Sequence, residues 1–448
     1  MDQIMSESAI LHLQRAIQCK TISYKDRSLM DFSEFEKFIE NIRTDFPTIF
    51  AAGQIERFVG YSLLIKLPGK SDLPPIGLMG HFDVVPVREE NWIEPPFSGV
   101  VVDGYVYGRG TLDMKGHVIS MLEAVESLLT EGFEFERDVY IMLGHNEETG
   151  SILPDSGATA IRDHLKQLGV LFSMVVDEGG ALIDGKSLGI DGTVALIGVG
   201  EKGYLDIELT ATQSGGHASM PPKKSAMAQI FEAAVSLEKN KFPADFNDAT
   251  NAMFDSLIPH MKQPLKFLFS HRQLFKPLLL KVMTDKPDTA AVLRTTCVAT
   301  MASGSFAPNV LAQKATVVCN VRIIPGESIE SVRDRVQTMV GSEIEVKLHN
   351  GTEPTDISPS NIREFEIIQE TTREHYPHFK AIAPYLMVAA TDSRVYHGMA
   401  KGVYRIAPFE ISKEDMKTVH ADNERVLIEN YLRGIGFFKS LIRKASQS

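Results

Sequence analysis

Imidazole and carboxylate side chains follow several apolar, strand-like runs in the first 180 residues of the chain. Each comes directly after such a run or in the glycine-rich turn beyond it; the six are His81, Asp83, Asp113, Glu147, Glu148 and Asp177. In open α/β sheets, the carboxyl ends of the strands form the edge where ligands bind. Histidine, aspartate and glutamate are ligands that zinc, manganese and cobalt accept. The pattern therefore predicts a divalent-metal site at one edge of a sheet.

The number of these groups suits two metal ions better than one. A pair of divalent ions held about 3.5–4 Å apart needs a bridging carboxylate and further ligands on each side. His420, in the segment TVHADNE (418–424) before the last predicted helix, is the candidate for a second histidine. The side chains of Glu147 and Glu148 point in different directions, so one can bind metal while the other acts as general base.

Other interpretations of these residues are weaker. A single acidic residue at a strand end is usually a helix cap or a solvated loop residue, so the prediction depends on their joint occurrence. The glycines of GYVYGRG (104–110) do not open a helix with the spacing that a phosphate-binding loop needs. Ser219 lies outside any G-x-S-x-G elbow, and each of the three cysteines lies in a run typical of core packing.

The composition excludes several classes of function. The chain has 448 residues, with 58 acidic against 46 basic side chains and a net charge of −12. Nucleic acid and anionic membranes attract basic surfaces, so neither is an expected partner. The amino terminus lacks the pattern of a signal peptide, and no stretch reaches the roughly 18 apolar residues that cross a bilayer. With three scattered cysteines and no disulfide framework, we expect a cytoplasmic protein.

The elements that must position these groups alternate between strands and helices up to about residue 198. Strand-like runs occur at 61–69, 75–83, 138–148 and 172–180, and helical patterns at 33–46, 118–129 and 157–169. Ser33 is the candidate N-cap of the first of these helices, whose apolar residues recur at helical spacing. Such alternation predicts an α/β sheet that is covered by helices on both faces.

A different pattern occupies residues 198–350. Strands are predicted at 204–212, 297–302, 314–323 and 343–348, and helices at 224–239 and 328–340. The order β-α-β-β-α-β is the ferredoxin-like plan. The apolar insert at about 240–295 is interpreted as extra helices on this second domain. The α/β pattern resumes at 351 and ends in a helix at 422–445, so the domain of 198–350 interrupts one formed by 1–197 and 351–448.

Eight segments, taken in order, are similar to the motifs of one enzyme family. They are GHFDVVP (80–86), GRGTLDMKG (108–116), GHNEETG (144–150), VVDEGG (175–180), SGGHASMPP (214–222), NVLAQKATVVCNVRIIPG (309–326), TDSRVY (391–396) and HADNE (420–424). The chain thereby resembles the metallopeptidase family of aminoacylase, acetylornithine deacetylase, succinyl-diaminopimelate desuccinylase and carboxypeptidase S. WIEPPFSG (92–99), IGVGEKGY (197–204), TDSRVY and YRIAPFEISKEDM (404–416) resemble the carboxypeptidase S branch, which includes enzymes acting on N-acyl amino acids with apolar acyl groups.

The resemblance implies a fold and a metal site. The fold is α/β: a zinc-peptidase-like catalytic domain with a central mixed sheet covered by helices, and an inserted ferredoxin-like lid domain. Two Zn²⁺ ions are implied per subunit, with Co²⁺ or Mn²⁺ as substitutes. The implied ligands are His81 and Asp177 for one ion, Glu148 and His420 for the other, and Asp113 as the bridge. The family pattern also places a cis peptide bond after Asp113.

The resemblance also assigns catalytic and binding roles. Glu147 would act as general base and then as general acid, and Asp83 would accept the second ring N–H of His81. His217 would polarise the scissile carbonyl, in dimeric relatives often from the partner subunit. The residues implied to bind the substrate are Asn309 and Arg322, at its free carboxylate, and Thr391 and Arg394, in the floor of the pocket. An arginine suits a carboxylate because it can donate two parallel hydrogen bonds.

Departures from the family pattern concern substrate size and assembly. Ala389 and Ala390 stand where many relatives have glycine, as does Ala421, and these changes would narrow the pocket or alter the approach of the backbone. The insert at 240–295 leaves open whether the usual dimer surface of the lid domain is exposed. If the insert covers that surface, His217 must act from its own chain after domain closure.

The leading hypothesis is hydrolysis of an amide bond next to a free α-carboxylate, in a dipeptide-like or N-acyl amino acid substrate. The expected partners are this small molecule or short peptide and, through the lid domain, a second copy of the chain. Two alternatives stay open. A zinc aminopeptidase would recognise a free amine instead of the carboxylate, and a catalytically silent relative would keep the fold without the reaction.

Overall fold

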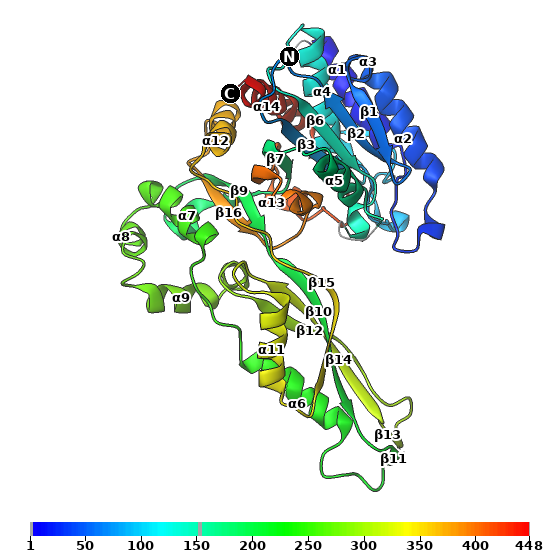
Figure 1. The fold of residues 1–448 in the computed structure, drawn as a ribbon, viewed down its shortest axis with the longest axis vertical. Helices are drawn as coiled ribbons and strands as arrows, with labels where there is room; N and C mark the ends of the chain where they lie inside the picture. Colours follow the sequence, from blue (N-terminus) through cyan, green and yellow to red (C-terminus); the bar gives the residue numbers. More distant parts are fainter. Residues whose placement is uncertain (1–2, 151–154, 448) are drawn as a thin grey trace.

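The computed structural model describes residues 3–150 and 155–447. Figure 1 shows an elongated molecule in which a large body, built around one sheet, carries a narrower body with a second sheet. No helix among the described residues combines the length and the apolar composition that a membrane span requires.

The large sheet has the order β1-β2-β6-β3-β7-β17-β9-β16, with β8 paired to β9. Its strands are β1 (Gln54–Phe58), β2 (Ser62–Leu67), β3 (Ile76–His81), β6 (Val139–Gly144), β7 (Phe172–Glu178), β8 (Ala181–Asp184), β9 (Thr193–Glu201), β16 (Ala381–Met387) and β17 (Ala400–Ile406). The sheet is mixed, since β2 and β6 pair antiparallel. β3 runs parallel to both β6 and β7, so the carboxyl ends of these three strands meet at one edge.

Helices cover both faces of this sheet, which confirms the predicted α/β class. Leu78 and Ile141 face a core that is shared with α1 (Gln3–Ile17), α2 (Phe32–Asp45), α3 (Pro47–Ala52), α4 (Lys115–Thr130), α12 (Arg363–His375) and α14 (Ile428–Gln447). Their neighbours Met79 and Met142 face the opposite core, under α5 (Gly157–Gln167) and the 3-10 helix Asp392–Tyr396. Successive residues of a strand point to opposite faces, so one continuous apolar run supplies both cores.

Two helix boundaries differ from the prediction. α2 follows Asp31, whose side chain accepts a hydrogen bond from the backbone N–H of Ser33, so Asp31 and not Ser33 is the N-cap. Both residue types cap helices well, and apolar periodicity does not distinguish them. The last helix, α14, begins at Ile428 rather than 422, because the residues before it form β18 (Arg425–Leu427), which pairs with β5 (Tyr105–Tyr107). β5 also pairs with β4 (Val101–Val102). The short helix α13 (Lys413–Met416) precedes β18 in the chain.

The second sheet has the predicted ferredoxin-like topology. Its order is β12-β14-β10-β15, and all neighbouring strands are antiparallel. The strands are β10 (Gly203–Thr212), β12 (Thr296–Ser303), β14 (Lys314–Ile323) and β15 (Glu345–Thr352), and α6 (Ala226–Lys239) and α11 (Ile329–Val340) pack on one face. A short pair, β11 (Gly216–His217) and β13 (Val310–Leu311), forms the far tip of this body (Figure 1).

The helices of the insert pack on the large sheet and not, as predicted, on the second domain. They are α7 (Asp248–Leu257), α8 (Leu265–Ser270), α9 (Lys276–Thr284) and α10 (Pro287–Ala291). Phe254 and Leu257 of α7 share a core with Val194 of β9 and Ala383 of β16. The face of β9 and β16 is apolar and needs cover, whereas α6 and α11 already cover the second sheet. The sequence shows that the insert is apolar but not which surface it covers.

Candidate active site

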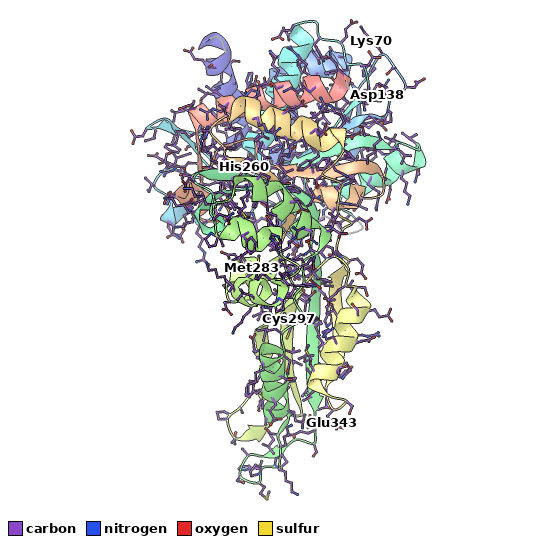
Figure 2. The ribbon with its side chains drawn as sticks, turned by 90° about the vertical axis from the view of Figure 1, so that its left-hand side faces the viewer. Lys70, Asp138, His260, Met283, Cys297 and Glu343 are labelled. Atoms are coloured by element: carbon purple, nitrogen blue, oxygen red, sulfur yellow. The ribbon has the colours of Figure 1, made fainter. Side chains whose placement is uncertain are left out.

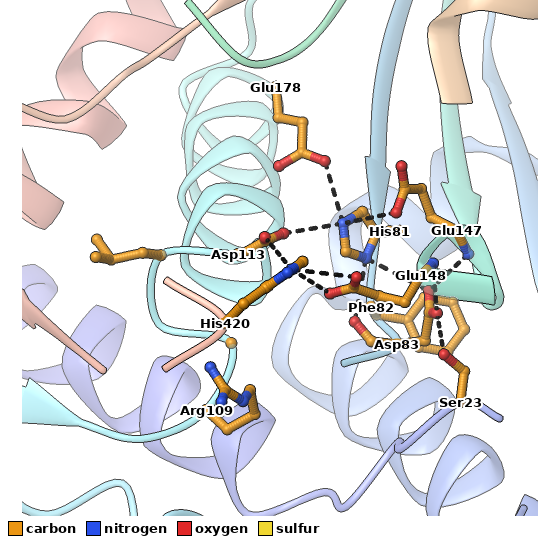
Figure 3. Close-up of polar contacts among 12 residues, drawn as sticks. Ser23, His81, Phe82, Asp83, Arg109, Asp113, Glu147, Glu148, Glu178 and His420 are labelled. Carbon is orange, nitrogen blue, oxygen red and sulfur yellow. Dashed lines mark hydrogen bonds and ion pairs between the residues drawn. The ribbon is translucent and has the colours of Figure 1, made fainter. Parts of the chain in front are cut away.

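Six ionisable side chains meet at the carboxyl ends of β3, β6 and β7 (Figure 3): His81, Asp113, Glu147, Glu148, Glu178 and His420. His81 is the last residue of β3 and is buried. Its Nε2 lies 3.2 Å from Oδ1 of Asp113 and 3.1 Å from Oε1 of Glu178. Oε2 of Glu147 lies 4.0 Å from the same nitrogen. One imidazole therefore faces three carboxylates.

Asp113 lies between the two histidines of the cluster. Its Oδ1 faces His81, and its Oδ2 lies 2.9 Å from Nε2 of His420. The same nitrogen of His420 lies 3.2 Å from Glu148. One ligand atom each from His81, Asp113 and Glu148 fit within 4.8 Å of one another. The peptide bond between Asp113 and Met114 is cis, as the resemblance implied.

Glu424 joins the loops that carry Asp113 and His420. Its Oε2 accepts a hydrogen bond from Nη1 of Arg109 at 2.6 Å, and both side chains are buried. Its Oε1 accepts hydrogen bonds from three backbone N–H groups, those of Gly110, Leu112 and Asp113. The sequence predicted no role for Glu424, although it is the last residue of the motif HADNE. Its role becomes visible only with its hydrogen-bond partners, which lie far from it in the sequence.

Asp83 holds His81 and also the turn that carries the glutamate pair. The backbone oxygen of Asp83 lies 3.1 Å from Nδ1 of His81, and its Oδ1 lies 3.4 Å away. Its carboxylate accepts the backbone N–H groups of Glu147 and Glu148 and the hydroxyl of Ser23. Burial opposes the charged form, but the hydrogen bonds from His81 and Ser23 keep the pKa of Asp83 below its usual value. The contact with the glutamate turn was not predicted.

Glu178, and not the predicted Asp177, faces the cluster. Asp177 is buried, and its Oδ2 accepts a hydrogen bond from the backbone N–H of Ser393 at 3.0 Å. Neighbouring residues of β7 point to opposite faces, so only one of the two acids can approach His81. The motif VVDEGG contains both acids, and it does not show which one faces the edge. Glu178 is therefore a further candidate ligand, and the role of Asp177 as a ligand stays a prediction.

The cluster holds more acidic groups than its histidines neutralise. Burial and neighbouring carboxylates raise the pKa of Glu178 to about 8, and they also raise the pKa of Glu148. Burial opposes the ionisation of Asp113, but the adjacent histidines lower its pKa. Hydrogen bonds to Asp113 and Glu148 raise the pKa of His420 to about 10. Buried carboxylates in excess favour a bound cation, and carboxylate and imidazole donors together fit zinc, cobalt or manganese.

His217 and Asn309 lie at the tip of the second domain, away from the cluster. His217 is in β11, and Asn309 directly precedes β13, the strand that pairs with it (Figure 1). The His217 side chain is exposed, and its Nδ1 lies 2.7 Å from the hydroxyl of Ser219. In this arrangement, a single chain does not bring His217 to its own cluster.

Arg322 lies at the opposite end of the second sheet from Asn309. Its guanidinium carbon is 4.9 Å from the ring centroid of Tyr204, near the start of β10. At about 3.3 Å per residue, the length of β14 between the two places is roughly 25 Å. The prediction that Asn309 and Arg322 hold the same carboxylate is therefore wrong for one chain in this arrangement. Sequence motifs give the order of Asn309 and Arg322 along the chain but not the distance between them in the folded protein.

Thr391 and Arg394 meet at Glu201, where the large sheet leads into the second domain. The Thr391 hydroxyl donates to Oε1 of Glu201 at 2.8 Å, and Nη1 of Arg394 lies 3.7 Å from its Oε2. Arg405 also donates from Nε to Glu201 at 2.8 Å, and both residues are fully buried. Sequence reasoning missed Glu201 and Arg405, although both lie in segments with the family pattern.

Comparisons with known proteins identify the family and the fold. The sequence profile of Peptidase family M20/M25/M40 matches residues 77–444. The chain is 34% identical to probable carboxypeptidase S-like 2 of Dictyostelium discoideum, over 97% of this chain and 84% of the relative. It is 35% identical to the N-fatty-acyl-amino acid synthase/hydrolase PM20D1 of Xenopus tropicalis, over 97% of this chain and 85% of the relative. Among solved structures, the M20 family metallo-carboxypeptidase Sso-CP2 of Sulfolobus solfataricus has the same fold, with a TM-score of 0.70 at 17% identity over 100% of both chains.

Proposed function

Because the chain belongs to peptidase family M20/M25/M40, we propose that it is a metal-dependent hydrolase that cleaves the amide bond of an N-acyl amino acid or a dipeptide-like molecule with a free α-carboxylate. The observation that carries the proposal is Asp113, placed between His81 and His420 with Glu147 nearby. A carboxylate between two histidines suits two cations, and a further carboxylate beside them can move a proton.

We propose two divalent cations per chain, with zinc as the first choice. One set of ligands is His81 and Glu178, the other is His420 and Glu148, and Asp113 belongs to both. Cobalt and manganese accept the same donors, so metal content must be measured. Bound cations would polarise the scissile carbonyl and lower the pKa of the attacking water toward neutrality.

Glu147 has the environment of a general base. Its carboxylate is near His81, and no hydrogen bond to its oxygens is formed within the part of the chain that the structure describes. Burial raises its pKa well above the usual value, and the charges of Asp392 and Glu178 add to that effect. A general base is most effective when its pKa approaches the working pH. We assign to Glu147 the removal of a proton from water and its later delivery to the leaving amine.

Cationic groups near the domain junction support recognition of the substrate carboxylate. Arg394 is largely buried, and burial lowers its pKa; the charge of Glu201 opposes this effect, while the charges of Arg405 and Arg322 lower the pKa further. Burial and the charge of Arg322 also lower the pKa of Lys202, to about 7. Neighbouring cations repel one another, and a bound anionic ligand stabilises their charged forms. For the acyl side of the amide we propose a fatty chain, because the chain aligns over 97% of its length with a relative named as an N-fatty-acyl-amino acid synthase/hydrolase.

We place His217 in the active site of a partner subunit. A homodimer through the second domain would bring the tip of one chain to the cluster of the other. Several large apolar side chains of this domain are exposed, which supports its burial in an assembly: Phe231 and Val235 of α6, and Val298 and Met301 of β12. There, His217 would donate a hydrogen bond to the oxygen of the scissile carbonyl as negative charge develops on it.

The three cysteines bear on the compartment. Cys19, Cys297 and Cys319 are all free, and two of them are buried. Disulfides form and persist in oxidising compartments. We therefore propose a reducing compartment such as the cytoplasm.

The decisive experiment is turnover of a substrate panel with added Zn²⁺ and after chelation. The panel contains an N-acetyl amino acid, an N-fatty-acyl amino acid, a dipeptide, and the C-terminal amide of each. The proposal expects activity that disappears with chelator, requires the free carboxylate and is highest on the fatty acyl compound. Cleavage of the C-terminal amides, together with a requirement for a free amine, would instead indicate an aminopeptidase.

A further inference from the structure

Helix α9 and the turn before it carry apolar side chains on two neighbouring faces, and only one of these faces is packed. Leu279 and Met283 belong to the core shared with β9 and β16. Figure 2 labels Met283. On the other face, Leu274, Leu278 and Val282 recur every four residues and are 52–76% exposed. A helix face made of large apolar side chains is normally buried against another element. The outer face of α9 therefore has the character of a binding surface.

Helix α8 extends this surface. Phe267 is half exposed, and its ring lies 5.8 Å from that of Phe275 and 4.5 Å from that of His271. These ring contacts join the two helices into one surface. We call it the outer apolar surface; its residues are Phe267, Leu274, Leu278 and Val282. Figure 1 shows α8 and α9 at the periphery of the molecule, away from the tip of the second domain.

The charges beside this surface are basic in an acidic protein. Residues 256–284 contain five basic side chains and no aspartate or glutamate, although the chain has a net charge of −12. Three of the five pair with acids from outside this range: Lys262 with Asp191, Arg272 with Asp255, and Lys276 with Asp245. Lys266 and Lys281 have no ion-pair partner among the described residues, and they directly precede Phe267 and Val282. Two uncompensated cations thus border the apolar side chains.

We propose that the outer apolar surface docks the protein on an anionic lipid surface. Helices that lie in a membrane interface present apolar side chains to the acyl region and keep lysine ammonium groups at the level of the head groups. A second copy of the chain fits less well, because a two-fold contact would bring Lys266 and Lys281 of both copies together. The net charge of the whole chain predicted no such partner, because it averages over this acid-free segment. Docking is independent of catalysis and does not rest on the proposed reaction.

The test is sedimentation of the full-length protein with vesicles, without any substrate. One set of vesicles is phosphatidylcholine, and the other also contains phosphatidylglycerol. We expect binding to the anionic vesicles that weakens with salt, and little binding to the neutral ones. The double variant Lys266→Gln/Lys281→Gln removes the two unpaired cations without touching the core. Its binding to anionic vesicles should fall about 25-fold, since each lysine near such a surface contributes about fivefold.

A matched control separates this surface from net charge. Lys239→Gln/Lys347→Gln makes the same charge change on exposed lysines of the second domain, and it should leave vesicle binding nearly unchanged. Leu274→Gln/Leu278→Gln tests the apolar part and should weaken binding at least about tenfold, because two leucines no longer leave water. The proposal is overturned if the wild type does not bind anionic vesicles or if both lysine pairs weaken binding equally. It is also overturned if the leucine variant binds normally, or changes the oligomeric mass instead.

Discussion

His81 and His217 stand for two regions of the molecule with opposite properties. His81 is buried at the end of β3 and lies within hydrogen-bonding distance of Asp113 and Glu178. His217 is exposed in a strand of two residues at the tip of the second domain, and its imidazole contacts Ser219. The first histidine is held by a large core beneath it. The second is held mainly by the local backbone pairing of β11 and β13.

This difference indicates how the chemistry is divided. The candidate metal ligands are positioned by strands and loops of the large domain, so one chain assembles them without help. Such preorganisation is what a metal site requires. The proposed polarisation of the substrate carbonyl by His217, by contrast, would depend on the arrangement of the domains and on assembly, because His217 lies at the tip of the second domain. Variants in the two regions should therefore fail in different ways.

The largest effect is expected for Glu147→Gln. Removal of a general base costs roughly 10²- to 10⁴-fold in turnover, while the candidate metal ligands remain in place. Elemental analysis of the purified variant should show the same metal content as the wild type. Glu148→Gln is the matched control, and it should lose both activity and metal, because Glu148 is beside His420. Loss of metal from Glu147→Gln would contradict the assignment of the base.

The next largest effect is expected for His217→Ala. Loss of one donor to the developing oxyanion costs about 10²- to 10³-fold in turnover, with metal content unchanged. Mixing this variant with Glu147→Gln, after dissociation and reassociation, tests where His217 acts. About a quarter of wild-type activity should return, because half of the dimers are mixed and each contains one complete site. No recovery despite mixed dimers would place His217 in its own chain.

A smaller effect should separate the two acids at the end of β7. Glu178→Gln should lower the affinity for metal by at least roughly 10- to 100-fold, because the carboxylate of Glu178 faces His81. A loss of that size is typical when a residue that only hydrogen-bonds to a metal ligand is replaced. Asp177→Asn should weaken it less, since Asp177 accepts a hydrogen bond from the backbone of Ser393. Titration of the metal-free proteins with Zn²⁺ measures both. The reverse order would restore Asp177 as the ligand.

The smallest effect is a dependence of metal-free stability on pH. The folded-state pKa of Glu178 is about 8, above the value of about 4.3 in an unfolded chain. Between these values the folded protein binds the extra proton, so its stability falls as the pH rises. The ion pairs of His420, with a pKa of about 10, are likewise lost as the pH rises through that value.

Bound cations replace these protons, so the difference in Tm between metal-loaded and chelated protein should widen by a few degrees from about pH 5 to about pH 8. Differential scanning calorimetry at several pH values measures this difference. In Glu178→Gln the widening should be smaller. A difference in Tm that stays constant with pH would show that these carboxylates are already ionised without metal, because metal binding would then release no protons.

Much of the fold prediction rested on local sequence patterns. The strands β3, β6 and β7 were predicted because each is an apolar run followed by a turn, and the groups at their ends followed from the same pattern. The second sheet was predicted because its strands and helices have clear periodicity and a characteristic order. In both cases, residues close in sequence decide the structure, through side-chain alternation in strands and helical spacing in helices.

The sequence by itself determined the fold class, the order of the elements and the kind of chemistry, because these depend on residue types and on short-range periodicity. Only the tertiary structure decided that Glu178 faces His81, that Glu424 joins the two ligand loops, and that the insert covers β16. It also decided that His217 lies far from the cluster of its own chain. These outcomes depend on which residues distant in sequence pack together, and the type of an apolar or acidic residue does not determine which residue it contacts.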